Sequence, residues 1–372
     1  MIKFHEPYKS RNTNKYLDDV TIVNNFSNNK YNTLCLDLLK SKFGFTNIHL
    51  TNSATASLEI MGMILKNENN KNTTLLPSYT FSSTANGFLR SQQKIKFIDI
   101  DVNNGMIDLS DKIFYESNTE NNLCIVHYAG SSIEFDNLPS MSRNKIFEDA
   151  AQGLGTRYKK NQIGTFGRFG CISFHPTKSI HSGFGGLINF KYKKDFEKAK
   201  EILERGTDRT KVISGLKNKY EWTTLGSSFE LPEINAAILY SQLQKFDEII
   251  EIRKEIYDIY FEKLNDPSLG ISTQKFNPRK IDHNFHSFYI VLENFNRDIF
   301  ISKMNNMGVQ CYIGYVPLHT SIYGKKNFKT GKLKNTDKFG SKLVRLPIHT
   351  NMRKEDANNV VKCINKVLKD ND

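Results

Sequence analysis

The 372-residue sequence has no apolar run near the roughly 20 residues that would span a bilayer, and its start, MIKFHEPYKS, lacks the apolar core of a signal peptide. We therefore expect a cytoplasmic protein without a membrane partner. The cysteines are few and scattered, and no two are spaced as C-x-x-C, so neither a disulfide framework nor a zinc or iron–sulfur site is indicated. No metal is expected. The five cysteines are Cys35, Cys124, Cys171, Cys311 and Cys363.

Several catalytic and cofactor motifs are also absent. No G-x-G-x-x-G follows a strand signal and no G-x-x-x-x-G-K-[ST] occurs, so the phosphate-binding loops of dinucleotide and P-loop proteins are missing. The nucleophile elbow G-x-S-x-G and the zinc motif H-E-x-x-H are missing too. These absences argue against nicotinamide, nucleotide-hydrolysing, serine-hydrolase and zinc-protease chemistry.

The net charge of +13 comes from 52 Lys and Arg against 39 Asp and Glu. Basic residues are interleaved with acidic ones, as in KYKKDFEKAK, which is typical of solvated helix faces. We therefore do not expect nucleic acid as a partner. A small substrate that carries phosphate is compatible with this charge.

Up to about residue 190, short β-rich runs alternate with segments of helical length, which predicts an α/β layer structure with a mostly parallel sheet flanked by helices. Several runs end in polar or reactive residues, and ligands collect at the carboxyl ends of parallel strands. The seven runs are NIHL, TLLP, KIKFIDI, LCIVHYA, KIFED, CISFH and LINF.

Beyond the predicted sheet, LPEINAAILYSQLQKFDEIIEIRKEIYDIYFEKL has helical periodicity throughout and predicts one long connecting helix. The strand HSFYIVLE and the helices RDIFISKMNNMG and EDANNVVKCINKVLKD follow and predict a smaller α+β unit. We expect a large domain over residues 1–245 and a small C-terminal domain over residues 246–372.

Lys178 follows the strand run CISF directly, and Asp149 ends the run KIFED. Pyridoxal phosphate (PLP) needs a lysine for its Schiff base and an acid against its pyridinium nitrogen, so this pair fits that cofactor. Each residue also has an ordinary interpretation, because most lysines are surface charges and aspartate is a common helix N-cap.

The segment TNSATASLEIMGMIL opens an apolar helix after the run NIHL, and its first N–H groups with Ser53 and Thr55 could form an anion site. Simple N-capping would give the same pattern. Phe81 in PSYTFSSTAN is the candidate ring to stack on the cofactor, although core aromatics are commoner.

Ten short sequence blocks, taken in order along the chain, resemble the nucleotide-sugar aminotransferases of the DegT/StrS family. Within that family they look nearest to the dTDP-4-amino-4,6-dideoxygalactose transaminases, and the resemblance covers nearly the whole chain. The ten blocks are TNSATASLE, PSYTFSSTAN, FIDID, VHYAG, EDAAQG, SFHPTK, GSSFELPEINAA, HSFYIVL, YVPLH and RLPIH.

The resemblance implies a fold-type I PLP enzyme that works as a homodimer with its active site at the subunit interface. Lys178 would form the Schiff base and move the proton during transfer. The other cofactor residues that the resemblance implies are Asp149 at the ring nitrogen, Gln152 at the ring hydroxyl, Phe81 on the ring face, and Ala54, Thr55 and Ser173 at the phosphate, joined by Ser228 from the partner subunit.

The resemblance indicates the residues that contact the substrate less directly than those that contact the cofactor. The loop SGFGG after Lys178 is shorter than the acidic GGEGG-like loop common in the family, which leaves the exact sugar open. The candidate substrate contacts are Tyr315 and His319 of YVPLHTS, Lys217 or Lys219 of SGLKNKYEW, and His175 beside the lysine loop.

We expect transfer of an amino group from L-glutamate to a dTDP-4-keto-6-deoxyhexose, with a 4-amino-4,6-dideoxygalactose product for surface polysaccharide synthesis. The gluco epimer and a 3-keto sugar remain alternatives. A sugar dehydratase on the same fold would have histidine in place of Lys178 or an iron–sulfur cluster. A non-catalytic PLP-binding regulatory protein is the remaining alternative.

Overall fold

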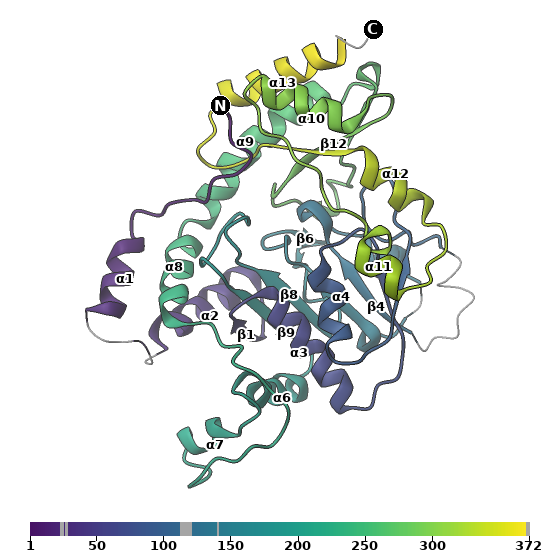
Figure 1. Cartoon of the computed structure of the whole chain (residues 1–372). Coiled ribbons are helices and arrows are strands. Elements are labelled where there is room, and N and C mark those ends of the chain that lie inside the picture. The colour runs from purple at the N-terminus through teal and green to yellow at the C-terminus, as the bar shows by residue number, and fades with distance from the viewer. Residues whose placement is uncertain (23–25, 27–28, 112–120, 140, 370–372) are drawn as a thin grey trace.

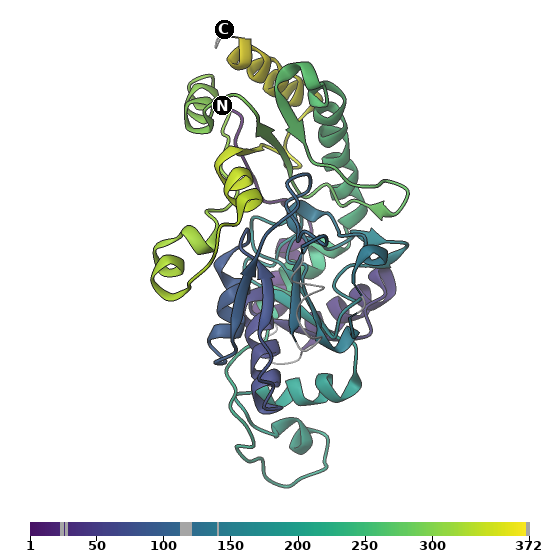
Figure 2. The same cartoon turned by 90° about the vertical axis from the view of Figure 1, so that its right-hand side faces the viewer.

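The computed structural model describes all residues except 23–25, 27–28, 112–120, 140 and 370–372. A large lobe is built around one sheet, and a C-terminal lobe packs at one end of it (Figure 1). In the view turned by 90° the C-terminal lobe lies at one end of the molecule and helices α6 (Lys193–Leu203) and α7 (Arg209–Ile213) lie at the other (Figure 2).

The central sheet has seven strands in the order β1-β9-β8-β5-β4-β2-β3. All neighbours pair in parallel except β9, which is antiparallel to both β1 and β8. The predicted mostly parallel sheet is confirmed. Its strands are β1 (Asn47–Thr51), β2 (Thr74–Pro77), β3 (Ile95–Ile98), β4 (Asn122–Val126), β5 (Ile146–Asp149), β8 (Phe169–Ser173) and β9 (Gly186–Phe190).

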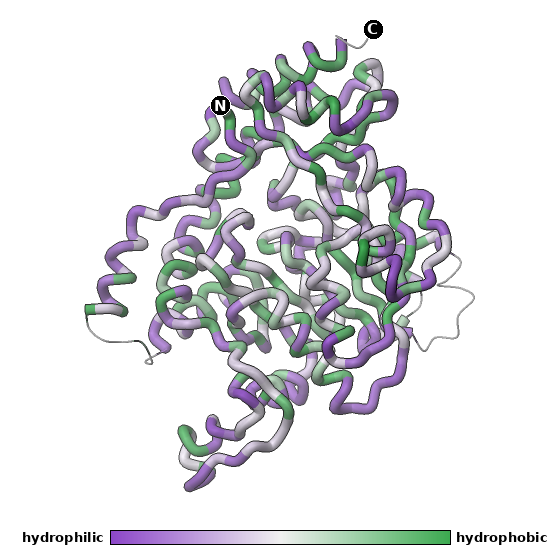
Figure 3. The backbone as a smooth tube through the Cα atoms, viewed as in Figure 1, coloured by the Kyte–Doolittle hydropathy of each residue, from purple (hydrophilic) through white to green (hydrophobic). Residues whose placement is uncertain are grey.

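Both faces of this sheet are covered, so its strands are apolar on both sides. On β8, Cys171 joins the core under one helical layer while Ile172 joins the core under the other. The hydrophobic stretches accordingly gather inside the large lobe (Figure 3). One layer comprises α3 (Ala54–Asn67), α4 (Ser82–Leu89) and α6, and the other α1 (Thr13–Thr21), α2 (Lys30–Phe43) and α8 (Glu233–Leu243).

The expectation of one long helix after residue 231 is wrong. The segment forms α8 and then α9 (Phe246–Leu264), and the backbone leaves helical geometry at Lys245 (φ −108°, ψ 11°). The two halves bury their apolar faces in different cores, since Leu239 packs in the large lobe and Tyr260 in the C-terminal lobe. We keep the domain boundary after residue 245 as a proposal.

The C-terminal lobe contains an antiparallel sheet in the order β10-β12-β13, covered by α9, α10 and α13. The N-terminal segment also belongs here, because Ile2 bridges to Val309. No helix among the described residues could span a membrane. The elements of the C-terminal lobe are β10 (Ile271–Thr273), β12 (Phe288–Leu292), α10 (Arg297–Asn306), α11 (Ile322–Asn327), α12 (Lys334–Lys342), β13 (Leu343–Leu346) and α13 (Lys354–Lys369). A small third sheet comprises β11 (Ile281–Asp282), β6 (Arg157–Tyr158) and β7 (Asn161–Gln162).

Candidate active site

A cavity of about 550 Å³ lies where the carboxyl ends of β5 and β8 meet the first turn of α3. This is the place where parallel sheets bind ligands. The C-terminal lobe closes one side of it, since Tyr315 and Arg345 also line it. The sequence-predicted residues that line the cavity are Ala54, Thr55, Phe81, Asp149, Gln152, Ser173, His175, Lys178 and Tyr315.

Lys178 lies half-buried in the loop after β8, where its backbone N–H donates to His175 O at 2.9 Å. Its amine makes no ion pair or hydrogen bond with a described residue. Burial, followed by the charge of Arg345, lowers the pKa of Lys178 from 10.5 to about 8, although Asp149 opposes the shift. At pH 7 about one tenth of such an amine is free base, far more than for an ordinary lysine. The free amine is the form that attacks an aldehyde.

Asp149 is buried at the end of β5 and is fixed by three donors. Thr84 Oγ1 donates to Oδ2 at 2.6 Å, while Ala151 N at 3.1 Å and Cys171 Sγ at 3.7 Å donate to Oδ1. Charge-assisted hydrogen bonds of this kind hold a carboxylate in one orientation. The carboxylate therefore faces the cavity in a defined position.

The start of α3 presents unpaired donors. Ser53 caps the helix by accepting from Ala56 N at 3.1 Å, but the N–H groups of Ala54 and Thr55 have no acceptor among the described residues. Thr55 Oγ1 lies 2.8 Å from Ser83 Oγ. Free N–H groups and the helix dipole form an anion site.

Gly186 of the SGFGG loop allows this helix start to approach the sheet. A Cβ on Gly186 would lie 2.4 Å from Ala54 N and 2.5 Å from Ser53 C, closer than atoms can pack. The glycine therefore sets the position of the helix start that carries the unpaired N–H groups.

Gln152 and Tyr315 connect the two lobes across the cavity. Gln152 Nε2 donates to the Tyr315 hydroxyl at 2.9 Å, and Gln152 Oε1 accepts from Ala129 N at 2.6 Å. The Phe81 ring is 59 % exposed and lies 6.1 Å from the Tyr315 ring. An aromatic face is thus open to the cavity next to these polar groups.

Four predicted residues do not line the cavity of their own chain. His319 lies between Ser78 Oγ at 2.7 Å and Asp337 Oδ1 at 3.1 Å, and its contact with substrate stays a prediction. Lys217 pairs with Asp208 at 2.7 Å and Glu221 at 2.9 Å, and Lys219 is exposed. Ser228 is exposed, and its carbonyl accepts from Asn52 Nδ2 at 2.9 Å.

The sequence analysis did not identify three residues that line the cavity or orient a side chain in it. Thr84 orients Asp149, although a threonine inside a helix gives no recognisable signal. His286 and Arg345 line the cavity and are the first residues of the blocks HSFYIVL and RLPIH. Burial and nearby cations hold the pKa of His286 well below its ordinary value, so this imidazole is neutral.

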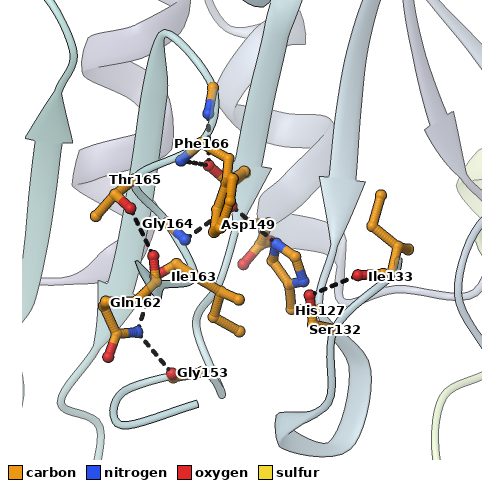
Figure 4. Close-up of polar contacts among 12 residues, drawn as sticks. His127, Ser132, Ile133, Asp149, Gly153, Gln162, Ile163, Gly164, Thr165 and Phe166 are labelled. Atoms are coloured by element: carbon orange, nitrogen blue, oxygen red, sulfur yellow. Dashed lines mark hydrogen bonds and ion pairs between the residues drawn. The ribbon is translucent and has the colours of Figure 1, made fainter. Parts of the chain in front are cut away.

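A buried carboxylate supports the cavity wall next to Asp149. Glu148 accepts from His127 Nε2 at 3.0 Å and from the N–H groups of Gly164, Phe166 and Gly167, each at 2.7 Å. Figure 4 shows His127 directed at this cluster, beside the loop that carries Gly164 and Phe166. The cluster fixes the ends of β4 and β5 and thereby the strand end that carries Asp149.

Comparison with known proteins identifies this architecture. The sequence profile of the DegT/DnrJ/EryC1/StrS aminotransferase family matches residues 9–365. The uncharacterized protein MJ1066 of Methanocaldococcus jannaschii is 28% identical over 356 residues, covering 92% of this chain and 90% of that protein.

Two further relatives have named activities. The UDP-4-amino-4,6-dideoxy-N-acetyl-beta-L-altrosamine transaminase of Campylobacter jejuni serotype O:2 is 26% identical, covering 82% of this chain and 81% of that protein. The UDP-4-amino-4-deoxy-L-arabinose–oxoglutarate aminotransferase of Shewanella sediminis is also 26% identical, covering 85% of each.

Solved structures share the fold. Helicobacter pylori PseC, an aminotransferase of pseudoaminic acid biosynthesis, superposes with a TM-score of 0.88 at 23% identity, covering 99% of each chain. The PLP form of Spr1654 from Streptococcus pneumoniae gives a TM-score of 0.87 at 18% identity, again covering 99% of each. The architecture is that of fold-type I PLP enzymes. The chain belongs to the DegT/DnrJ/EryC1/StrS aminotransferase family and is a PLP-dependent sugar aminotransferase.

Proposed function

We propose that this enzyme transfers the amino group of L-glutamate to a dTDP-4-keto-6-deoxyhexose and gives a dTDP-4-amino-4,6-dideoxyhexose, with the galacto product favoured. Surface polysaccharide synthesis would use this product. The observation that carries the proposal is the cavity in which Lys178 meets the carboxylate of Asp149 and the open helix start at Ala54 and Thr55. The cytoplasm remains the proposed compartment, on the sequence argument alone.

The residues of the cavity fit PLP. Its phosphate suits the N–H groups of Ala54 and Thr55, which have no acceptor among the described residues, together with the hydroxyl of Ser173, because these donors lie together at the cavity wall. Asp149 suits the pyridine nitrogen, since a buried carboxylate with fixed geometry keeps a bound cation charged. Phe81 suits the ring face, and the Gln152–Tyr315 pair suits the ring hydroxyl.

When bound, PLP supplies an electron sink that stabilises negative charge on the carbon next to the reacting amine. Lys178 supplies the base. Its amine, with a pKa of about 8, is available to take the proton from Cα of the donor and to return a proton at C4 of the sugar. His175, which lines the cavity beside it, is the proposed further substrate contact.

We also propose a homodimer with a shared active site. Residues 204–228 form an arm that projects from the large lobe (Figures 1 and 2). Leu216 is 77% and Trp222 78% exposed on it, and Ile213, Tyr220 and Leu225 of the same segment are exposed too. A group of exposed apolar side chains, unlike a single one, indicates an interaction surface. The arm also carries Lys217, Lys219 and Ser228, which fail to reach the cavity of their own chain. A second subunit would bring Ser228 to the phosphate and the lysines to the substrate diphosphate.

A UDP-linked 4-keto sugar is the second candidate acceptor. The relatives from Campylobacter jejuni and Shewanella sediminis are named for UDP-sugars, whereas the block pattern of this sequence resembles dTDP-sugar enzymes. The two candidates differ in the nucleotide base and in the substituents of the hexose, so they use the same chemistry at Lys178.

The test is product analysis. The holoenzyme is incubated with L-glutamate and either dTDP-4-keto-6-deoxyglucose or a UDP-linked 4-keto-6-deoxy sugar, and the product is identified by mass spectrometry and NMR. We expect a 4-amino product from the dTDP-sugar, with an axial amine for the galacto epimer. An equatorial amine would assign the gluco epimer, and a 3-amino product would require a 3-keto acceptor. If the enzyme binds PLP but never reacts with glutamate, the transaminase proposal fails.

A further inference from the structure

The N-terminal segment of the chain joins the two lobes next to the loop that carries Lys178. In Figure 1 this purple segment runs from the C-terminal lobe to α1, and we call its residues 2–8 the N-terminal strap. The loop between β8 and β9, residues 174–185, is called the lysine loop. The proposed cofactor and substrate contacts give the strap no role.

The first half of the strap is bound to the C-terminal lobe. Ile2 N donates to Gly308 O at 2.7 Å, and the Ile2 carbonyl accepts from Gln310 N at 3.0 Å. The carbonyl of Lys3 accepts from His349 Nε2 at 3.0 Å. These bonds come from two separate segments of the lobe, so they fix the position of the strap on it.

The second half of the strap is bound to the large lobe. The Tyr8 carbonyl accepts from Gln242 Nε2 on α8 at 3.0 Å and from His181 Nε2 at 3.1 Å. Burial lowers the pKa of His181, and its Nδ1 accepts from Gly183 N, so Nε2 carries the proton and donates. The strap therefore contacts the lysine loop three residues after Lys178.

His5 contacts the same loop on the other side of Lys178. Its Nε2 lies 2.7 Å from the carbonyl oxygen of Pro176, two residues before the lysine. Burial lowers the pKa of His5 from 6.5 to about 4, although the hydrogen bond to Pro176 opposes the shift, so the ring is neutral at pH 7. A carbonyl can only accept, and the proton of the neutral ring is therefore on Nε2. His5 is half-buried and lines the cavity together with Lys178.

The place of the Lys178 amine depends on the backbone of this loop. The amine makes no hydrogen bond or ion pair with a described residue, so the backbone sets where its flexible four-carbon stem begins. The loop contains neither helix nor strand, and Pro176 has no N–H with which to fix it. The turn at the lysine is closed by the bond from Lys178 N to His175 O at 2.9 Å. The contacts from His5 and Tyr8 lie on either side of that turn.

We propose that His5 is a positioning residue, which holds the Pro176 carbonyl and thereby sets the backbone turn from which Lys178 reaches the cofactor. The bonds of the strap to the C-terminal lobe fix His5 in turn. This inference rests on the proposed role of Lys178 as the Schiff-base lysine. The alternative is that His5 adds only to the stability of the fold.

Three substitutions of His5 test the proposal, because they differ in where they place a donor. The amide nitrogen of glutamine can occupy the place of Nε2, whereas that of asparagine corresponds to Nδ1 and alanine has no donor. His5→Gln should therefore behave as wild type, and His5→Asn and His5→Ala should share one defect. Lys3→Ala is the matched control, because the Lys3 side chain is exposed and pairs with Glu6 at the surface.

The first measurement needs no cofactor. In the apoprotein, amide hydrogen exchange of residues 174–182 should be about tenfold faster in His5→Asn and His5→Ala, as expected for the loss of one hydrogen bond. Peptides from β4 and α6 should exchange as in wild type. His5→Gln and Lys3→Ala should agree with wild type within about twofold.

The second measurement follows the lysine itself. The rate of PLP uptake by apoprotein should fall about tenfold in His5→Asn and His5→Ala, because the amine is held less often where the cofactor binds. With saturating PLP, kcat should fall by a similar factor for the reaction with glutamate and for the reaction with the keto sugar, since the same amine moves the proton in both. KM for glutamate should change less than about twofold.

Three results would overturn the inference. They are wild-type exchange of the lysine loop in His5→Ala, equal defects in His5→Gln and His5→Ala, or a lower free energy of unfolding in His5→Ala with unchanged PLP uptake and kcat. Failure of the proposed role of Lys178 would look different, because Lys178→Ala would then take up PLP as wild type does, whichever residue stands at position 5.

Discussion

The side-chain amide of Gln152 donates a 2.9 Å hydrogen bond to the hydroxyl of Tyr315, which joins the β5 end of the large lobe to the C-terminal lobe. The same Gln152 accepts from Ala129 N, so both ends of its amide are used. The bond crosses the candidate active site. The relative position of the lobes therefore depends on a polar contact inside the cavity.

Removing this contact should weaken both stability and activity. In Tyr315→Phe the Gln152 amide loses its acceptor, and an unsatisfied group of this kind costs about 1–3 kcal/mol. Urea unfolding should show a decrease within that range, and kcat/KM should fall. Tyr323→Phe is the control, since Tyr323 is exposed on α11. Equal stability of Tyr315→Phe and wild type would show that the bond contributes nothing.

The lowered pKa of Lys178 predicts how apoprotein takes up PLP as pH changes. Only the free amine reacts, so the uptake rate should rise with pH with a midpoint near the pKa of about 8. Arg345 lowers this pKa and Asp149 raises it, so Arg345→Gln should move the midpoint up and Asp149→Asn should move it down. The absorbance band at about 400–430 nm reports uptake and should be absent in Lys178→Ala. A midpoint near 10.5 in wild type would contradict the prediction.

Asp149 and Thr84 should differ in their contributions to catalysis. Asp149→Asn removes the charge proposed to face the ring nitrogen and should lower kcat by about 1000-fold or more. Thr84→Val removes only the donor that orients the carboxylate, so we expect a loss of about tenfold. Steady-state kinetics of both variants measure these effects, with Asp258→Asn on the exposed face of α9 as the control. Similar losses in the Thr84 and Asp149 variants would contradict this division of roles.

Gly186 should tolerate no side chain. Its Cβ would lie 2.4 Å from Ala54 N, so Gly186→Ala must displace the start of α3. We expect a stability loss of about 2 kcal/mol and weaker PLP binding, measured by urea unfolding and by cofactor titration. Gly331→Ala is the control, because nothing lies within 4 Å of its added Cβ. Normal PLP affinity in Gly186→Ala would place the phosphate elsewhere.

The exposed arm should be required for assembly. Leu216→Ser with Trp222→Ser removes two large apolar side chains from it, and the proposed dimer should dissociate in light-scattering measurements. Activity should be lost with the dimer, because Ser228 of the partner subunit is proposed to complete the site. Ile322→Ser on α11 is the control for removing an exposed apolar side chain. A fully active monomer would refute the shared site.

Part of this site could be predicted from the sequence. Lys178, Asp149 and Thr55 were predictable because each follows or ends a strand run or opens a helix, and parallel strands bring their carboxyl ends together, whereas Ala54 was named through the family resemblance. The nucleotide and the hexose could not be predicted in this way, because the proposed substrate contacts Lys217 and Lys219 lie on the arm and not at a strand end of the central sheet. The sequence also could not predict that His319 lies between Ser78 and Asp337, because neither partner is its neighbour in sequence.

The sequence by itself determined the mostly parallel sheet, the glycine loop and the lysine–aspartate pair, because strand periodicity and residue order are local properties. Only the tertiary structure decided that the helix breaks at Lys245, that Thr84 orients Asp149, and that Arg345 lines the cavity without an acidic partner among the described residues. These features depend on which distant segments share a core or a cavity. Local propensity carries no information about such contacts, and packing in two separate cores overrides the helical pattern around residue 245.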